Sequence, residues 1–265
     1  MGDALATTYD DTIDALEAIV ARCSADRDRI GYFAAMYLAV TRTVRQRAAE
    51  GRFADEARME RFVTGFAARY LDALEAWQLG APCTESWQVA FGATRRWRPI
   101  VLQHLLLGMN AHINLDLGVA AAEVADGAAI DAVRADFDAV NDVLRDLVDG
   151  AQGALGQVSP WLGLVDRIGG SGDETLIRFS LVAARRQAWS VATRLSAQSA
   201  NERQAATDAV DASAARIGRA VEHPGVLAST LLLVVRARER ADPAEVMRLL
   251  VDFGRPESPP VPSTP

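Results

Sequence analysis

Hydrophobic residues recur every three to four positions along most of the chain, which is the spacing of amphipathic helices. The first such stretch runs from about Thr8 to Arg22. The same spacing predicts further helices over about 28–50, 55–79, 84 or 86 through 97, 101 to before 126, 130–155, 173–195, 202–221, 224–239 and 243–253. We therefore expect an all-α fold, a bundle of about eight to ten helices around one central helix.

The end of the chain differs in composition from the rest. Residues 254–265 hold five of the ten prolines, together with small polar residues, a composition typical of disordered segments. No similar linker divides the preceding residues. We expect a single all-α domain over 1–253 and a disordered Pro-rich tail over 254–265.

Charge and cysteine usage exclude several classes of protein. A net charge of −7 argues against a nucleic-acid binder. Cys23 and Cys83 stand far apart in no motif, so we expect neither a disulfide framework nor a cysteine-based zinc site. The N-terminus shows no signal peptide. These features favour a cytoplasmic protein without a membrane partner, and they leave its oligomeric state open.

The predicted central helix, 101–118, carries most of the functional information. It is apolar except for six polar residues, and it holds two of the three histidines of the chain. Polar groups on a buried helix are costly without partners, so they usually have a structural or chemical role. The six are Gln103, His104, Asn110, His112, Asn114 and Asp116.

Helical geometry sorts these six residues into two stripes. At roughly 100° per residue, Gln103, Asn110 and Asn114 fall on one face and form an amide stripe. A second stripe has a residue at every fourth position: His104, Gly108, His112 and Asp116. The predicted helix therefore has polar partners on two sides and lines a pocket.

His112 and Asp116 lie one turn apart, so their side chains can meet. They can share one divalent metal ion, or Asp116 can orient His112 as an acid/base; the alternative is a buried histidine with purely structural partners. His104 lies about 12 Å from His112 along the axis, too far to bind the same ion. A metal would need ligands from other helices. We do not expect haem, although a histidine can be its axial ligand and Gly108, between the two histidines, would make room for it.

Three residues on other helices are candidates to complete the pocket. Tyr37 and Tyr70 lie on apolar faces, where each hydroxyl needs a partner. Asn141 lies on the apolar face of the helix predicted over 130–155 and can pair with the amide stripe. We expect Asn110, Asn114, Gln103, Tyr37, Tyr70 and Asn141 to bind the ligand, with purely structural hydrogen bonds as the alternative.

Two acidic patterns raise a different possibility. Asp10, Asp11 and Asp14 match the aspartate-rich motif with which terpene cyclases hold magnesium diphosphate. Asn141 and Asp149 have a spacing that resembles the second metal motif of that class, but Arg145 stands where a small hydroxyl residue is expected. The first pattern also lies at the extreme N-terminus, and acids are frequent throughout the chain, so coincidence is favoured.

The segment His104-Leu-Leu-Leu-Gly-Met-Asn-Ala-His-Ile-Asn-Leu-Asp-Leu117 resembles a bacterial family of proteins with a domain of unknown function, number 5995. Further matching stretches are 32–41, 98–103, 159–161 and 166–170, and the resemblance spans most of 30–189. It supports the location of the site and implies no activity.

We expect an enzyme that acts on a small, largely apolar molecule by hydrolysis, isomerisation or cyclisation, with His112, Asp116 and His104 as catalytic residues. The rival interpretation is a non-catalytic ligand-binding or interaction protein with a structural polar network. A further alternative is the magnesium-dependent, terpene-cyclase-like enzyme.

Overall fold

The first helices begin where the sequence provides side-chain caps. Thr8 and Asp11 form a capping box at the start of α1 (Tyr9–Asp26), each side chain accepting the backbone N–H of the other. Asp55 accepts the Arg58 N–H at the start of α3 (Glu56–Leu79), and Gly80, with φ 70°, ends that helix. Because these signals are local, the helix starts agree closely with the sequence prediction.

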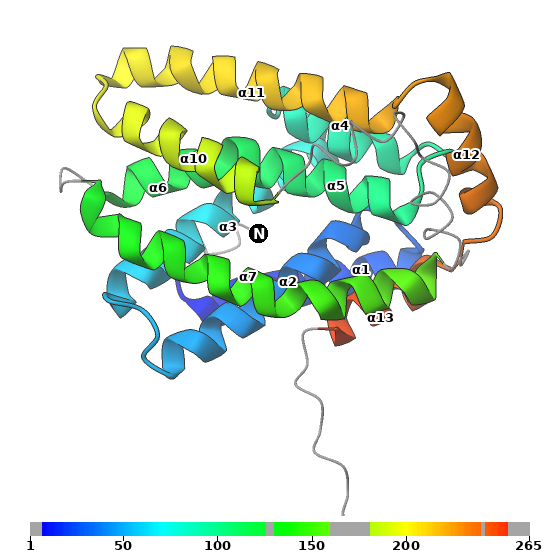
Figure 1. The fold of residues 1–265 in the computed structure, drawn as a ribbon, viewed down its shortest axis with the longest axis horizontal. Helices are drawn as coiled ribbons and strands as arrows, with labels where there is room; N and C mark the ends of the chain where they lie inside the picture. Colours follow the sequence, from blue (N-terminus) through cyan, green and yellow to red (C-terminus); the bar gives the residue numbers. More distant parts are fainter. Residues whose placement is uncertain (1–6, 126–129, 160–180, 240–241, 254–265) are drawn as a thin grey trace, which may run out of the picture.

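The computed structural model describes residues 7–125, 130–159, 181–239 and 242–253, and among them it contains helices and no strand (Figure 1). The all-α prediction is confirmed. The Pro-rich tail 254–265 lies outside the described residues. Besides α1 and α3, the helices are α2 (Gly31–Ala49), α4 (Glu85–Thr94), α5 (Val101–Ala111), η1 (His112–Asp116), α6 (Leu117–Ala125), α7 (Asp131–Val158), α10 (Leu181–Ser196), α11 (Ala200–Glu222), α12 (Val226–Arg236) and α13 (Pro243–Asp252).

The helix formed by α5, η1 and α6 is continuous over Val101–Ala125 and lies at the centre of the bundle. Its α5 part packs against α2, α4 and α11, and its α6 part packs against α3 and α10 (Figure 1). By length and composition alone this helix could cross a membrane, but 83% of its most apolar window is buried within the protein. Its apolar surface therefore contributes to the core.

The helices predicted over 84 or 86 through 97 and over 224–239 are shorter than their patterns predict. The fourth helix ends at Thr94 and does not reach Trp97, which is 60% exposed. Pro99 disfavours the helical conformation of the residue before it, so the chain is extended on entering α5. Helix α12 begins only after Gly225, whose φ is 95°. The predicted helix start near 173 lies outside the described residues.

The middle of the central helix departs from α geometry. Over η1 the hydrogen-bond spacing widens by one residue, and the Leu117 N–H donates to the His112 carbonyl. Single π-helical turns of this kind occur frequently at functional sites. This segment contains both His112 and Asp116, so the irregular turn coincides with the pair that the sequence predicts.

Candidate functional site

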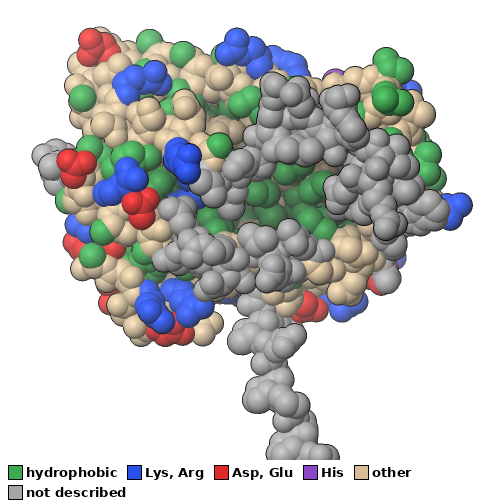
Figure 2. Space-filling model, viewed as in Figure 1, with side chains coloured by type: hydrophobic (Ala, Val, Ile, Leu, Met, Phe, Trp, Pro, Cys, Tyr) green, Lys and Arg blue, Asp and Glu red, His purple; other side chains and the backbone are tan. Residues whose placement is uncertain are grey.

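A cavity of about 420 Å³ lies between α2, α3, the central helix and α7, with α10 and α13 closing its sides. Its lining is almost entirely apolar, and Figure 2 shows hydrophobic side chains at the centre of the face drawn. Among the described residues of the lining, Arg185 is the one with a charged side chain. Its guanidinium lies over the Phe137 ring and donates to the Phe137 carbonyl. Other lining residues include Phe33, Met36, Val40, Phe66, Met109, Leu144 and Leu147.

His112 belongs to the wall of this cavity and is enclosed by aromatic rings. Phe66 stacks on the imidazole with ring centroids 3.6 Å apart, and Tyr37 meets it edge-on at 4.5 Å. The Nδ1 atom lies 3.3 Å from the Asp116 Oδ2 atom. The two residues predicted to meet across one turn therefore do meet.

Asp116 is 1% exposed, and both of its carboxylate oxygens have partners. Arg69 Nε donates to Oδ1 at 3.2 Å, and Trp87 Nε1 donates to Oδ2 at 2.9 Å. A buried carboxylate is tolerated when a cation and hydrogen bonds compensate its charge. Arg69 and Trp87 were not predicted from the sequence. The sequence indicated only that Asp116, if buried, needs a cationic partner.

The imidazole of His112 is neutral near pH 7. Burial lowers its pKa from the ordinary value of 6.5, and the hydrogen bond to Asp116 offsets part of that effect. We assign the proton to Nδ1, because that atom faces a carboxylate that can only accept. Nε2 then holds a lone pair, and among the described residues it has no hydrogen-bond partner.

Two tyrosine hydroxyls share this unsatisfied state. Tyr37 and Tyr70 are buried, and neither hydroxyl has a hydrogen-bond partner within the described part of the chain. Tyr37 lines the cavity, whereas Tyr70 does not. Of the tyrosines predicted to complete a pocket, the structure therefore places one in the cavity wall.

His104 lies apart from the cavity. It is buried on α5, packs edge-on against Tyr32 with ring centroids 5.7 Å apart, and is absent from the cavity lining. Burial, with the nearby cations Arg29 and Arg236, lowers its pKa to about 3. The structure therefore does not bring His104 to His112, and the geometry gives no support to its predicted catalytic role.

The amide stripe exists as predicted, but it faces the neighbouring helix α11. Asn110 Nδ2 donates to the Ala214 carbonyl at 2.7 Å, and Asn114 Nδ2 donates to Asn110 Oδ1 at 2.9 Å. These amides are occupied by protein partners and are absent from the cavity lining, so the geometry favours the structural alternative. The side chain of Asn141 lies outside the described part of the structure.

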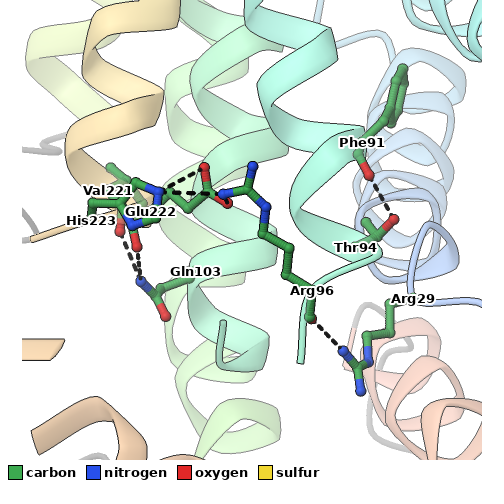
Figure 3. Close-up of polar contacts among 8 residues, drawn as sticks. All are labelled: Arg29, Phe91, Thr94, Arg96, Gln103, Val221, Glu222 and His223. Carbon is green, nitrogen blue, oxygen red and sulfur yellow. Dashed lines mark hydrogen bonds and ion pairs between the residues drawn. The ribbon is translucent and has the colours of Figure 1, made fainter. Parts of the chain in front are cut away.

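Gln103 has a similar structural role at the start of α5. Its Oε1 accepts the Ile100 N–H at 3.1 Å. Its Nε2 donates to the Val221 carbonyl at 2.8 Å (Figure 3). Next to it, Arg96 donates to Glu222 at 2.7 Å. In Figure 3, Gln103 joins the end of α11 to α5, and Arg96 joins it to the segment between α4 and α5.

Comparison with known proteins places the chain in a family. Residues 9–224 match the sequence model of the family described as "Family of unknown function (DUF5995)". The chain belongs to the DUF5995 family. No curated protein and no solved structure matches it.

The DUF5995 match includes the whole central helix and the His112–Asp116 pair, and it ends before α12 and α13. It confirms the resemblance noted in the sequence. Since the family has no described activity, the chemistry has to be argued from the geometry of this DUF5995 protein.

The described residues do not fit a metal site. No three His, Cys, Asp or Glu side chains among them lie close enough to hold an ion. The carboxylate of Asp116 is already engaged by Arg69 and Trp87. The sharing of a metal ion by His112 and Asp116 therefore lacks a third protein ligand in this part of the chain.

The acidic pattern at the N-terminus has local partners. Asp10 pairs with Arg45, and Asp11 caps its own helix. Both carboxylates, and that of Asp14, are exposed and absent from the cavity lining. The side chains of Arg145 and Asp149 lie outside the described structure. The geometry therefore gives the terpene-cyclase interpretation no support.

Proposed function

We propose that the protein binds a small, largely apolar molecule in the central cavity. The observation that carries this proposal is the cavity itself, about 420 Å³ within an almost entirely apolar wall. Small-molecule sites have volumes of roughly 300–1,000 Å³, and protein cores are otherwise closely packed. A void of this size forfeits dispersion contacts that an apolar ligand would restore.

Binding of the neutral apolar dye N-phenyl-1-naphthylamine tests the proposal. The dye is expected to gain fluorescence with the wild-type protein, and Leu144→Trp should weaken its binding at least tenfold because the larger ring fills the cavity. Leu227→Trp is the matched control, since Leu227 is 81% exposed and distant from the lining. Equal affinities for both variants, or no dye binding by the wild type, would contradict the proposal.

A second candidate is acid/base catalysis on the bound molecule. The specific observation is the orientation of His112, whose Nδ1 faces Asp116 at 3.3 Å while Nε2 has no partner among the described residues. A neutral imidazole oriented by a carboxylate is the arrangement of a general base. In this role Asp116 would fix the ring and stabilise its charged form, and Nε2 would take a proton from the ligand.

Ligand exchange between variants separates catalysis from binding. Small molecules that co-purify with His112→Gln would be identified by mass spectrometry and then incubated with the wild-type protein. A catalyst converts the molecule held by the variant into a product. Recovery of the molecule unchanged from the wild-type protein would exclude this second candidate and leave the binding role intact.

A further inference from the structure

We propose that the ligand carries a hydroxyl group between two apolar arms, and that Tyr37 and His112 hold this hydroxyl. The inference rests on the proposed function, because it specifies which apolar molecules the cavity accepts. It comes from two buried polar atoms of residues that line the cavity, Tyr37 Oη and His112 Nε2. Neither has a hydrogen-bond partner among the described residues.

The two unsatisfied atoms belong to neighbouring rings. The rings of Tyr37 and His112 meet at 4.5 Å, and both residues are buried. A buried polar group without a partner typically costs about 1–3 kcal/mol, so two such groups are expensive to keep. An apolar pair such as Phe and Leu would avoid this cost. A ligand that supplies the missing hydrogen bonds gives both side chains a function.

The chemistry of the pair fits a hydroxyl. His112 Nε2 accepts a hydrogen bond, because the ring proton lies on Nδ1 opposite Asp116. The Tyr37 hydroxyl can donate. An alcohol satisfies both atoms, because it donates to Nε2 and accepts from the Tyr37 hydroxyl. A ketone can accept from Tyr37 but leaves Nε2 unpaired, and a carboxylate would present its charge to an acceptor.

The position of the pair predicts where the hydroxyl lies along the ligand. On α2 the lining extends from Phe33 to Val44, eleven helical steps or roughly 16 Å, and Tyr37 is the fifth residue of that stretch. On the central helix the lining extends from Leu102 to Leu117, and His112 lies within it. Apolar wall continues on both sides of the pair, so an apolar arm can extend in each direction.

Both polar atoms are buried beneath the surface of the cavity and are not accessible to water. A ligand hydroxyl therefore reaches them only when a ring in the wall turns aside. Phe33 and Phe66 contact the imidazole from the cavity wall, and Tyr37 itself carries one of the two atoms. Removal of the hydroxyl from Tyr37 should then weaken binding of an alcohol without changing the volume available to an alkane.

Displacement of N-phenyl-1-naphthylamine by four matched compounds tests the inference: 5-nonanol, 1-nonanol, 5-nonanone and nonane. We expect 5-nonanol to displace the dye at the lowest concentration, about tenfold below 5-nonanone, which makes one hydrogen bond fewer. In Tyr37→Phe, the ratio between the displacing concentrations of nonane and 5-nonanol should be about tenfold smaller than in the wild type. Tyr70→Phe is the control, because it removes an equally buried, unpaired hydroxyl outside the cavity lining.

Nitrogen NMR of the wild-type protein gives a readout that needs no variant. The chain has three histidines, so the ring resonances of His104 and His223 serve as internal references. A hydrogen bond from 5-nonanol should move the Nε2 resonance of His112, whereas 5-nonanone should leave it in place.

The outcomes separate this inference from the function on which it rests. If the dye does not bind at all, the proposed function fails. If the dye binds but 5-nonanol is no better than 1-nonanol or 5-nonanone, this inference is overturned and the apolar cavity remains the binding site.

Discussion

At the scale of single residues, Asp116 organises the site. Its carboxylate receives hydrogen bonds from α3 and α4 and also orients His112 on its own helix. Burial of an ionised carboxylate costs desolvation free energy, which a paired cation and hydrogen bonds offset. The same charge that fixes the imidazole therefore also joins three helices.

Asp116→Asn is expected to lower the free energy of unfolding by about 2–3 kcal/mol, because the partly buried Arg69 loses its charged partner. Chemical denaturation measures this loss. The control is Asp10→Asn, which breaks an exposed ion pair with Arg45 and should cost less than about 1 kcal/mol. Equal losses for both variants would show that Asp116 does not have this role.

His104 makes the stability depend on pH. Its pKa is about 3 in the folded protein, whereas histidine in an unfolded chain titrates near 6.5. Since the unfolded chain binds the proton first, the stabilisation is complete above about pH 6.5 and declines as the pH falls toward 3. At pH 4.5 the loss amounts to about 2–3 kcal/mol.

His104→Phe should reduce the difference in unfolding free energy between pH 7 and pH 4.5 by about that amount, because phenylalanine takes up no proton. Denaturant titrations at both pH values give the measurement. An unchanged difference between wild type and variant would mean that His104 is already protonated at pH 4.5 or is not buried.

At the scale of elements, the contact between α2 and α5 depends on a missing side chain. A Cβ atom at Gly108 would lie 2.4 Å from the Phe33 ring, which lines the cavity. Gly108 therefore allows the two helices to approach one another and sets the position of one wall. A glycine can allow close approach either of another helix or of a ligand. Gly108 allows the approach of a helix.

Gly108→Ala should destabilise the protein by about 1–3 kcal/mol, because Phe33 must move out of the way. It should also change dye binding, since Phe33, which lines the cavity, is displaced. Gly65→Ala in α3 is the matched control: a Cβ there meets nothing within 4 Å, so the helix should gain up to about 1 kcal/mol. Thermal unfolding of both variants distinguishes these effects, and stabilisation by Gly108→Ala would contradict the close contact.

At the scale of the whole molecule, a helix beyond the family match completes the cavity. The match ends at residue 224, yet α13 packs on α1, α2 and α7, and Leu250 belongs to the cavity lining. Met247 is fully buried, and its sulfur lies 2.2 Å from the position that a Cβ of Gly31 would take. The C-terminal part of this chain therefore contributes to the core of the matched region.

Met247→Ala should cost about 2–5 kcal/mol, the usual range for a fully buried methionine. Arg248→Ala, next to it on the exposed side of α13, should change stability by less than about 1 kcal/mol. Denaturant titration tests both. A negligible effect of Met247→Ala would show that α13 is not anchored to the rest of the fold.

The sequence by itself determined the features that depend on neighbours along the chain. The helices predicted from about Thr8 and from 55 begin there, because each of these residues caps N–H groups two or three positions away. Helical periodicity placed Asn110 and Asn114 on one face and brought His112 to Asp116, because residues four apart lie one turn from each other.

Only the tertiary structure decided which distant groups meet these residues. Arg69 and Trp87 reach Asp116 from other helices, and the amide stripe meets α11, because packing of the bundle brings together residues far apart in sequence. The same packing left His104 outside the cavity and His112 in its wall, although both lie on one stripe. Periodicity specifies a face of a helix, whereas the shape and contents of the space beside that face depend on every helix packed around it.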